Sequence, residues 1–283
     1  ALSEEQQAIF EMARDFGAAE IAPHARAWET GGTIPRTLWA KAAPLGFGGL
    51  TVSEASGGAG LSRLDATLVF EALAMACPSV SAFLSIHNMV AALIDRHGSD
   101  DLKSRILPGA VAMETVLSYC LTEPACGSDA AALTTKAIRT DTDWRLTGTK
   151  AFISGGGYSD AYLVMARSGG PGPRGISAIL LPADAPGLSF GGLEDKMGWR
   201  AQPTRQVQMD GAVAPLGNLL GEEGAGFRYA MEGLDGGRLN IAACSLGAAQ
   251  TALDTTLAYV HERRAFGKPL SDFQALQFAL ADC

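Results

Sequence analysis

The middle third of this sequence has a different residue pattern from the parts that flank it, and this contrast limits the possible folds. From Val116 the chain is Thr-rich and alternates apolar with polar residues, and Gly, Asp and Pro break it into short runs. Such runs are typical of β-strands. The best candidates are residues 133–140, 144–149, 162–166 and 176–181. Because helical patterns precede and follow them, the sequence predicts an α+β protein in the order helices, sheet, helices.

The first third carries helical start and stop signals. A Ser-x-x-Gln capping pattern at Ser3 opens a predicted amphipathic helix over residues 3–21, which Pro23 is expected to close. Further helices are predicted over residues 35–43 and, from apolar spacing, over residues 64–78. Glycine-rich loops separate them.

The last third returns to a helical pattern after a turn at residues 221–226. A long Ala- and Leu-rich helix is predicted over residues 227–264, and another begins near Phe273. No Gly or Pro stop signal follows it before Cys283, so we expect the natural protein to continue and this chain to be truncated. The predicted domains are a helical domain at 1–115, a β domain at 116–223 and the start of a second helical domain at 224–283.

Composition excludes several classes of function. Lys and Arg total 22 against 30 Asp and Glu, and the net charge of -8 argues against nucleic-acid binding and against a basic membrane-surface protein. No apolar stretch is long enough to cross a bilayer, so no membrane insertion is predicted. The four histidines lack metal-ligand spacing, and no metal site is predicted. The cysteines lack Cys-x-x-Cys spacing and are predicted to be buried or half-buried thiols in a reducing compartment: Cys77, Cys120, Cys126, Cys244 and Cys283.

One Gly-x-Gly-x-x-Gly match occurs at Gly170, Gly172 and Gly175. A dinucleotide site would need a helix after this turn, but a strand-like run follows and two prolines interrupt the motif. We therefore predict a hairpin loop. The local motifs of serine hydrolases, zinc peptidases and phosphoryl-transfer enzymes do not occur.

The most informative segment is Tyr-Cys-Leu-Thr-Glu-Pro-Ala-Cys-Gly-Ser-Asp at residues 119–129. It ends a predicted strand and enters a turn of small and hydroxyl residues, where backbone amides can approach a planar ligand. On the residues alone a purely local turn, with Thr122 and Ser128 bonding nearby backbone, is the favoured interpretation. Composition alone does not separate the two.

This segment resembles the Tyr-x-x-Thr-Glu-Pro-x-x-Gly-Ser-Asp signature of the acyl-CoA dehydrogenase family, and the resemblance extends over essentially the whole chain. Four further blocks are similar to the family in the same order: residues 150–155, 196–200, 221–227 and 262–268.

Other stretches are most similar to the branch of the family that oxidises isobutyryl-CoA. Asp235 stands where that branch has Asn, and Ala125-Cys126 replaces the usual small pair before Gly127. The similar stretches are residues 60–65, 85–89, 169–173 and 233–238.

The resemblance implies the acyl-CoA dehydrogenase fold, with an N-terminal helical domain, a β-barrel-like middle domain and a C-terminal helical bundle. It also implies FAD bound against the β domain, because this cofactor carries the redox chemistry. Arg263, Phe266 and Gln274 match positions that reach the FAD of a neighbouring subunit. The residues matching flavin contacts within the subunit are Tyr119, Leu121, Thr122, Gly127, Ser128, Phe152, Ile153 and Ser154.

The resemblance also implies an acyl-CoA channel. Asp235 and Arg238 are three apart on a predicted helix and so share a face, and Gly236 and Gly237 between them are costly in a helix interior. Close approach of the ligand would compensate that cost, although a simple surface ion pair between Asp235 and Arg238 is the alternative. Ser128 is the fifth predicted substrate contact.

Removal of the α-proton of a thioester needs a base, which is a glutamate in the family. Most members carry it in a region that would lie beyond Cys283, and a minority carry it at the position of Gly237. Glycine has no basic group, so no catalytic residue is assigned within this chain.

The implied activity is oxidation of isobutyryl-CoA to methacrylyl-CoA in valine breakdown, with an electron-transferring flavoprotein as acceptor. A homotetramer is expected, in a bacterial cytoplasm or alternatively in the mitochondrial matrix. The alternatives are another short- or branched-chain acyl-CoA dehydrogenase, an acyl-CoA oxidase, or a non-catalytic flavin or acyl-CoA binder.

Overall fold

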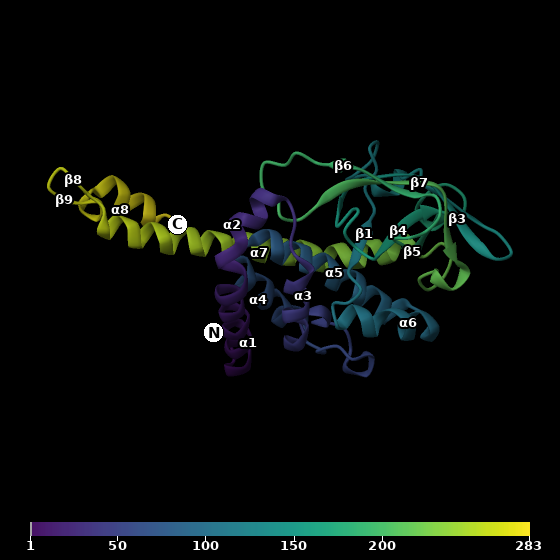
Figure 1. The fold of residues 1–283 in the computed structure, drawn as a ribbon, viewed down its shortest axis with the longest axis horizontal. Coiled ribbons are helices and arrows are strands. Elements are labelled where there is room, and N and C mark those ends of the chain that lie inside the picture. Colours follow the sequence, from purple (N-terminus) through teal and green to yellow (C-terminus); the bar gives the residue numbers. More distant parts are fainter. Residues whose placement is uncertain (1) are drawn as a thin grey trace.

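A computed structural model of the chain describes residues 2–283, and its first part is helical (Figure 1). The predicted helices over residues 35–43 and 64–78 are confirmed. The helices of this part are α1 (Glu4–Phe16), α2 (Ala22–Gly31), α3 (Arg36–Ala42), α4 (Arg63–Ala74), α5 (Pro78–His97) and α6 (Asp100–Val111).

The start of α1 follows the predicted capping pattern, but its end does not. Ser3 Oγ accepts a 3.1 Å hydrogen bond from the Gln6 amide, and the Gln6 side chain accepts one from the Ser3 amide. The expectation that Pro23 closes the helix is wrong. A π-helical turn (Gly17–Ile21) leads directly into α2, where Pro23 lies in the first turn and needs no intrahelical N–H. The chain leaves the helix only at Gly32, whose φ is 71°.

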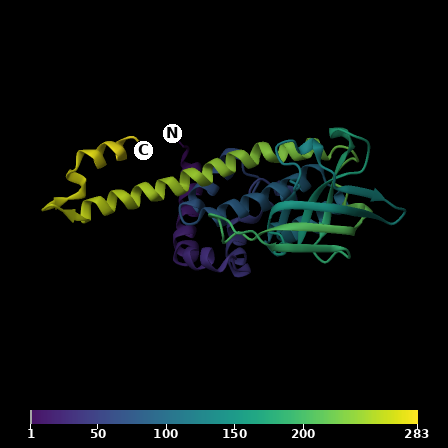
Figure 2. The ribbon, with the colours of Figure 1, turned by 90° about the horizontal axis from the view of Figure 1, so that it is seen from above.

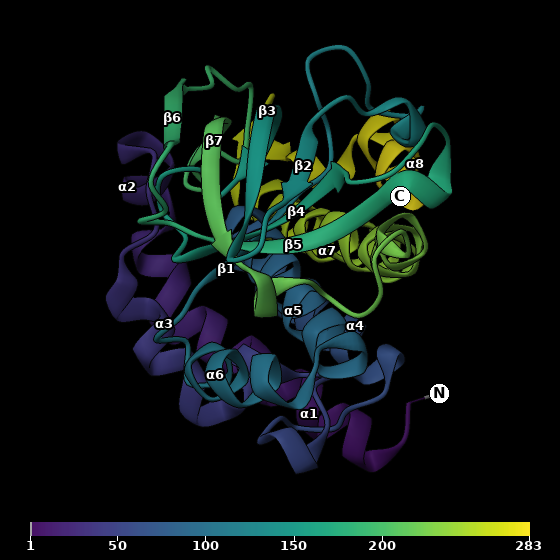
Figure 3. The same cartoon turned by 90° about the vertical axis from the view of Figure 1, so that its right-hand side faces the viewer.

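The middle part is a curled seven-stranded sheet in the order β1-β4-β2-β3-β7-β6, with β5 paired to β4 (Figure 3). The four predicted strand segments all contain strand, although the one predicted over 133–140 begins only at Lys136. Its first residues instead donate backbone amides to Glu123. The strands are β1 (Leu117–Cys120), β2 (Lys136–Arg139), β3 (Asp143–Ser154), β4 (Ala161–Arg167), β5 (Ile176–Pro182), β6 (Leu188–Leu193) and β7 (Thr204–Pro215).

The Gly-x-Gly-x-x-Gly segment is the hairpin loop that its sequence predicts. It joins the antiparallel strands β4 and β5, which pair from Arg167 with Ile176 onward. The amides of Ser168 and Gly169 donate to the carbonyl oxygen of Gly175 at 2.9 and 3.0 Å. The loop is thus closed by its own backbone.

The last part is dominated by α7 (Gly226–Glu262), a helix of 37 residues that spans the molecule from the sheet to the far end (Figure 2). It packs against α4, α5 and β5. Beyond it lie the short hairpin β8 (Arg264–Ala265) and β9 (Lys268–Pro269), then α8 (Gln274–Ala281). Both predicted C-terminal helices are therefore present.

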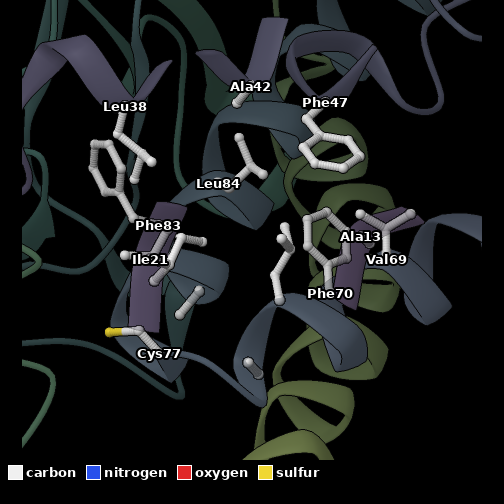
Figure 4. Packing of buried hydrophobic residues seen from close by; sticks show 14 of the residues in the cluster. Ala13, Ile21, Leu38, Ala42, Phe47, Val69, Phe70, Cys77, Phe83 and Leu84 are labelled. Carbon is white, nitrogen blue, oxygen red and sulfur yellow. The ribbon is translucent and has the colours of Figure 1, made fainter. Parts of the chain in front are cut away.

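Three clusters of buried apolar side chains hold these parts together. The first lies among α1, α3, α4 and α5 and includes Phe47, Phe70 and Phe83 (Figure 4). Cys77 belongs to it, in keeping with the predicted buried thiol. The same prediction is wrong for Cys283, which is exposed because it follows α8 on the surface. Within residues 2–283 no helix is both long enough and apolar enough to span a bilayer.

Candidate functional site

A cavity of about 500 Å³ lies where the sheet meets α5 and α7. One wall comes from the sheet and the other from the two helices. The sheet contributes Tyr119, Leu121, Thr122, Phe152, Ile153 and Ser154, and the helices contribute Ser85, Ile86, Met89, Leu234, Gly237, Arg238 and Ile241.

The sheet wall joins two segments that are about 30 residues apart in sequence. β1 pairs in parallel with β4 and delivers the chain to Leu121 and Thr122. The amide of Ala151 in β3 donates to the carbonyl oxygen of Thr122 at 2.9 Å. This bond sets the end of β1 beside the end of β3, so that both face the same cavity.

A buried ion pair fixes this junction from behind. Lys150 is fully buried, and its Nζ donates to Glu123 Oε1 and to the Leu121 carbonyl oxygen, both at 2.9 Å. The amides of Thr134 and Thr135 donate to the Glu123 carboxylate at 2.7 and 2.9 Å. Burial favours the neutral form of Glu123, but the Lys150 charge and these donors outweigh it and lower the pKa of Glu123 to about 2. The carboxylate is therefore ionised and structural.

Phe152 is held in an unusual backbone conformation. Its φ is 58°, and the pairing of β3 with β7 shifts register between Lys150 and Ile153. Such an irregularity turns side chains away from their ordinary alternation along a strand. The Phe152 ring consequently lines the cavity and stays 65% exposed. Left-handed backbone in a bulky residue persists only where its surroundings enforce it, and it is common at functional sites.

The structure brings six of the predicted flavin contacts together in the sheet wall. It does not support a purely local turn, since the hydroxyls of Thr122 and Ser128 form no hydrogen bond with other residues in 2–283 and Thr122 faces the cavity. Gly127 and Ser128 do not line the cavity. A Cβ on Gly127 would lie 3.8 Å from Thr122 Cγ2, so this turn folds back directly beside the wall.

The helix wall contains part of the predicted substrate site. Gly237 and Arg238 line the cavity, whereas Asp235 and Gly236 do not. Arg238 Nη1 and Asp235 Oδ1 form an exposed ion pair at 2.8 Å, which is the alternative that spacing also allowed. The close neighbour of Gly236 is a side chain, because a Cβ there would lie only 2.1 Å from Arg63 Nη1. Gly236 and Arg63 line a second cavity of about 270 Å³, so the ligand approach at Gly236 stays a prediction.

Five lining residues were not predicted, and they come from two helices. Their signal is helical spacing: Ser85, Ile86 and Met89 share one face of α5, and Leu234 and Ile241 share one face of α7. Two segments recognised by resemblance, 85–89 and 233–238, contain most of them. Only the packing of α5 against α7 reveals that these faces meet.

The three residues predicted to reach a neighbouring subunit lie at the other end of α7 from the cavity (Figure 1). Arg263 and Gln274 are exposed, and Phe266 is 94% exposed with a φ of 53°. They take no part in the cavity of their own chain. Their role across a subunit boundary stays a prediction.

The cavity suits a planar redox cofactor beside an acyl group. Its helix wall is largely apolar, and its sheet wall offers two aromatic rings, three hydroxyls and strand backbone. None of its lining residues within 2–283 carries a carboxylate, so the cavity residues supply no base for an α-proton. The described residues also hold no cluster of three His, Cys, Asp or Glu side chains suited to a metal ion.

Comparison with known proteins matches the three parts of the chain to the domains of one family. Family models described as the N-terminal, middle and C-terminal domains of acyl-CoA dehydrogenase match residues 3–114, 118–212 and 224–283. Isobutyryl-CoA dehydrogenase, mitochondrial, from Bos taurus is 51% identical over 281 residues, which are 99% of this chain and 68% of that protein.

Solved structures match over the same length. A chain from a structure of the electron transferring flavoprotein of Acidaminococcus fermentans is 38% identical with a TM-score of 0.96, and covers 100% of this chain and 75% of its own. A glutaryl-CoA dehydrogenase from Mycobacterium smegmatis, in complex with FADH2, is 30% identical with a TM-score of 0.93, covering 99% and 72%.

Proposed function

Because the chain belongs to the acyl-CoA dehydrogenase family, we propose that it is an FAD-dependent enzyme that oxidises a short branched acyl-CoA at its α and β carbons. Isobutyryl-CoA is the substrate and methacrylyl-CoA the product, which places the reaction in valine breakdown. The name of the bovine relative supports this choice.

The observation that carries the proposal is the cavity between the sheet wall and α5 and α7. FAD fits the sheet wall, because Thr122 and Ser154 place hydroxyls and strand backbone along it and Phe152 supplies an aromatic face. The remaining proposed contacts to FAD in this chain are Tyr119, Leu121, Gly127, Ser128 and Ile153.

The chain's own residues bind, orient and exclude water. Bound FAD supplies the acceptor for the hydride that leaves the β carbon. Ile86 and Met89 of α5 and Leu234 and Ile241 of α7 enclose a short apolar acyl group opposite the sheet wall. Burial removes water from both reactants and strengthens each hydrogen bond to the thioester oxygen.

The proton of the α carbon goes to a glutamate that we propose lies outside residues 1–283. The one position in α7 where some family members carry the base is Gly237, which has no side chain. The proposed acyl-CoA contacts in this chain are Ser128, Asp235, Gly236, Gly237 and Arg238.

We further propose the wider assembly. The domains run over residues 1–115, 116–223 and 224–283, and four copies form a tetramer in which Arg263, Phe266 and Gln274 contact the FAD of a neighbour. An electron-transferring flavoprotein takes the electrons. The mitochondrial name of the bovine relative supports the mitochondrial matrix, and a bacterial cytoplasm is the expectation from the Ala- and Gly-rich composition.

The test uses the full-length enzyme, purified with its flavin. Addition of isobutyryl-CoA without oxygen should bleach the visible flavin absorbance faster than butyryl-CoA or isovaleryl-CoA does. Equal bleaching by all three would remove the substrate assignment. A colourless protein that ignores every acyl-CoA would remove the function itself. Electron transfer to oxygen at the same rate as to the flavoprotein would favour an oxidase.

A further inference from the structure

A buried amide lies directly behind the sheet wall of the cavity. Gln202 belongs to the loop between β6 and β7 and is 5% exposed. Its Nε2 donates to Ser154 Oγ, while its Oε1 has no hydrogen-bond partner within residues 2–283. Ser154 in turn lines the cavity. Gln202 therefore touches a residue of the flavin wall without reaching the cavity itself.

The loop that carries Gln202 is held by contacts other than its amide. Lys196 Nζ donates to the carbonyl oxygens of Trp199 and Gln202, at 2.6 and 2.5 Å, and to Thr204 Oγ1 at 2.8 Å. Trp199 adopts a left-handed φ of 56° within this loop. Replacing the Gln202 side chain leaves all three Lys196 bonds in place.

The backbone of Ser154 is also fixed independently. Ser118 Oγ donates to the Ser154 carbonyl oxygen at 2.5 Å, and the Gly155 amide donates to the Pro203 carbonyl oxygen at 2.7 Å. A Cβ on Gly155 would lie 2.3 Å from Ser118 Oγ, so this approach requires glycine. Only the orientation of the Ser154 hydroxyl is left to Gln202.

A serine hydroxyl has one proton to donate and two lone pairs to accept with. Because Gln202 Nε2 donates to Ser154 Oγ, the serine proton points away from Gln202. We propose that Gln202 is a positioning residue that turns the Ser154 hydroxyl proton into the cavity, where it donates to an acceptor atom at the edge of the flavin ring. The inference rests on the proposed binding of FAD.

This arrangement tunes the flavin electrostatically. A donor to a carbonyl oxygen at the ring edge stabilises the reduced ring more than the oxidised ring, because that oxygen gains negative charge on reduction. A hydrogen bond accepted from Gln202 polarises the serine O–H and strengthens that donation. Loss of either side chain should therefore shift the equilibrium between oxidised and reduced FAD toward the oxidised form.

The experiment is a double-mutant cycle in the full-length, FAD-loaded enzyme. Ser154→Ala, Gln202→Leu and the double variant are titrated with a chemical reductant against a reference dye, so no acyl-CoA is needed. Ser154→Ala should shift the oxidised-to-reduced equilibrium about fivefold, as expected for one hydrogen bond, or roughly 20 mV for a two-electron couple. Gln202→Leu should give most of that shift, and the double variant should add nothing to Ser154→Ala.

Two further variants sharpen the test. Gln208→Leu makes the same substitution at an exposed position of β7 and should leave the equilibrium unchanged. Gln202→Glu keeps the shape but can only accept from Ser154, so it should shift the equilibrium at least as far as Gln202→Leu. A smaller shift in Gln202→Glu than in Gln202→Leu would mean that Gln202 accepts the serine proton, and the proposal would fall.

Other results would also overturn it. The proposal falls if Gln202→Leu binds FAD and titrates like the unaltered enzyme while Ser154→Ala shifts. It also falls if the shift caused by Gln202→Leu persists in full in the Ser154→Ala background. No shift in Ser154→Ala would remove the hydroxyl's role. Bleaching of the unaltered enzyme by isobutyryl-CoA is scored separately, so failure here is distinct from failure of the proposed function.

Discussion

The buried pair of Lys150 and Glu123 offers the sharpest test of how the site is held together. Lys150→Met keeps the apolar length of the side chain but removes its charge and its bonds to Glu123 and Leu121. Glu123 is then a carboxylate that is 4% exposed, with backbone amides but no cation beside it. We expect a large loss of folding stability and weaker FAD binding.

The magnitude follows from the burial of both partners. Removing one partner of a buried ion pair costs about 3–5 kcal/mol, because the other charge is left uncompensated. In a protein of this size roughly 2–4 °C of melting temperature corresponds to each kcal/mol. Lys150→Met should therefore melt roughly 10 °C lower. The double variant Lys150→Met/Glu123→Gln removes the stranded charge and should recover part of the loss.

The assay is thermal unfolding by calorimetry, together with FAD affinity from flavin fluorescence. Lys136→Met is the matched control, because Lys136 lies exposed on β2 and the same substitution there should cost less than about 0.5 kcal/mol. A Lys150→Met protein that melts with the control would refute the reasoning. So would a double variant that loses as much as the sum of its two single substitutions.

Three other predictions test backbone and packing features of the fold. Gly247→Ala places a Cβ 2.0 Å from the Glu71 carbonyl oxygen and should lower the free energy of unfolding by about 3 kcal/mol. Gly237→Ala places a Cβ 3.6 Å from Met89 Sδ and should raise the free energy of unfolding by up to about 1 kcal/mol. Urea unfolding measures both variants, and equal midpoints would contradict this ranking. Phe152→Gly should relieve roughly 1 kcal/mol of strain yet weaken FAD binding, and unchanged FAD fluorescence titration would count against the wall assignment. Burial lowers the pKa of His87 from about 6.5 to about 4, so the unfolded chain binds a proton at a higher pH than the folded chain does. The free energy of unfolding should therefore fall as the pH drops from 6.5 toward 4, by roughly 2 kcal/mol at pH 5. Urea midpoints that coincide at pH 7 and pH 5 would contradict this.

The order helices, sheet, helices could be predicted from the sequence because local patterns decide it, although α5, α6, β6 and β7 were not predicted. Alternation marked the strands, and helical spacing with the Ser3 cap marked the helices. The hairpin at Gly170–Gly175 followed from the absence of a helix after it. Patterns within ten residues were sufficient for each of these predictions.

Features that depend on contacts between distant segments could not be predicted. Pro23 reads as a helix stop, but a π turn accommodates it in the first turn of α2. In the sequence Lys150 is recognised only as part of the segment 150–155 that resembles the family, and the structure alone shows it buried against Glu123. The helix wall was missed for the same reason, since nothing local indicates that α5 and α7 face the end of β3.

Some glycines of α7 lie in close contact with neighbouring helices, and others do not. A Cβ on Gly233 would lie 3.1 Å from Leu93 Cδ1, one on Gly236 would meet Arg63, and one on Gly247 would meet the backbone of α4. Contact between helices requires glycine at Gly247, where the neighbour is backbone, whereas the flexible end of Arg63 can move away from a side chain at Gly236. At Gly237 the nearest atom is 3.6 Å away, so packing does not require glycine there. Because Gly237 lines the cavity, a larger side chain there would reduce the cavity volume, and we propose that this position limits the size of the acyl group.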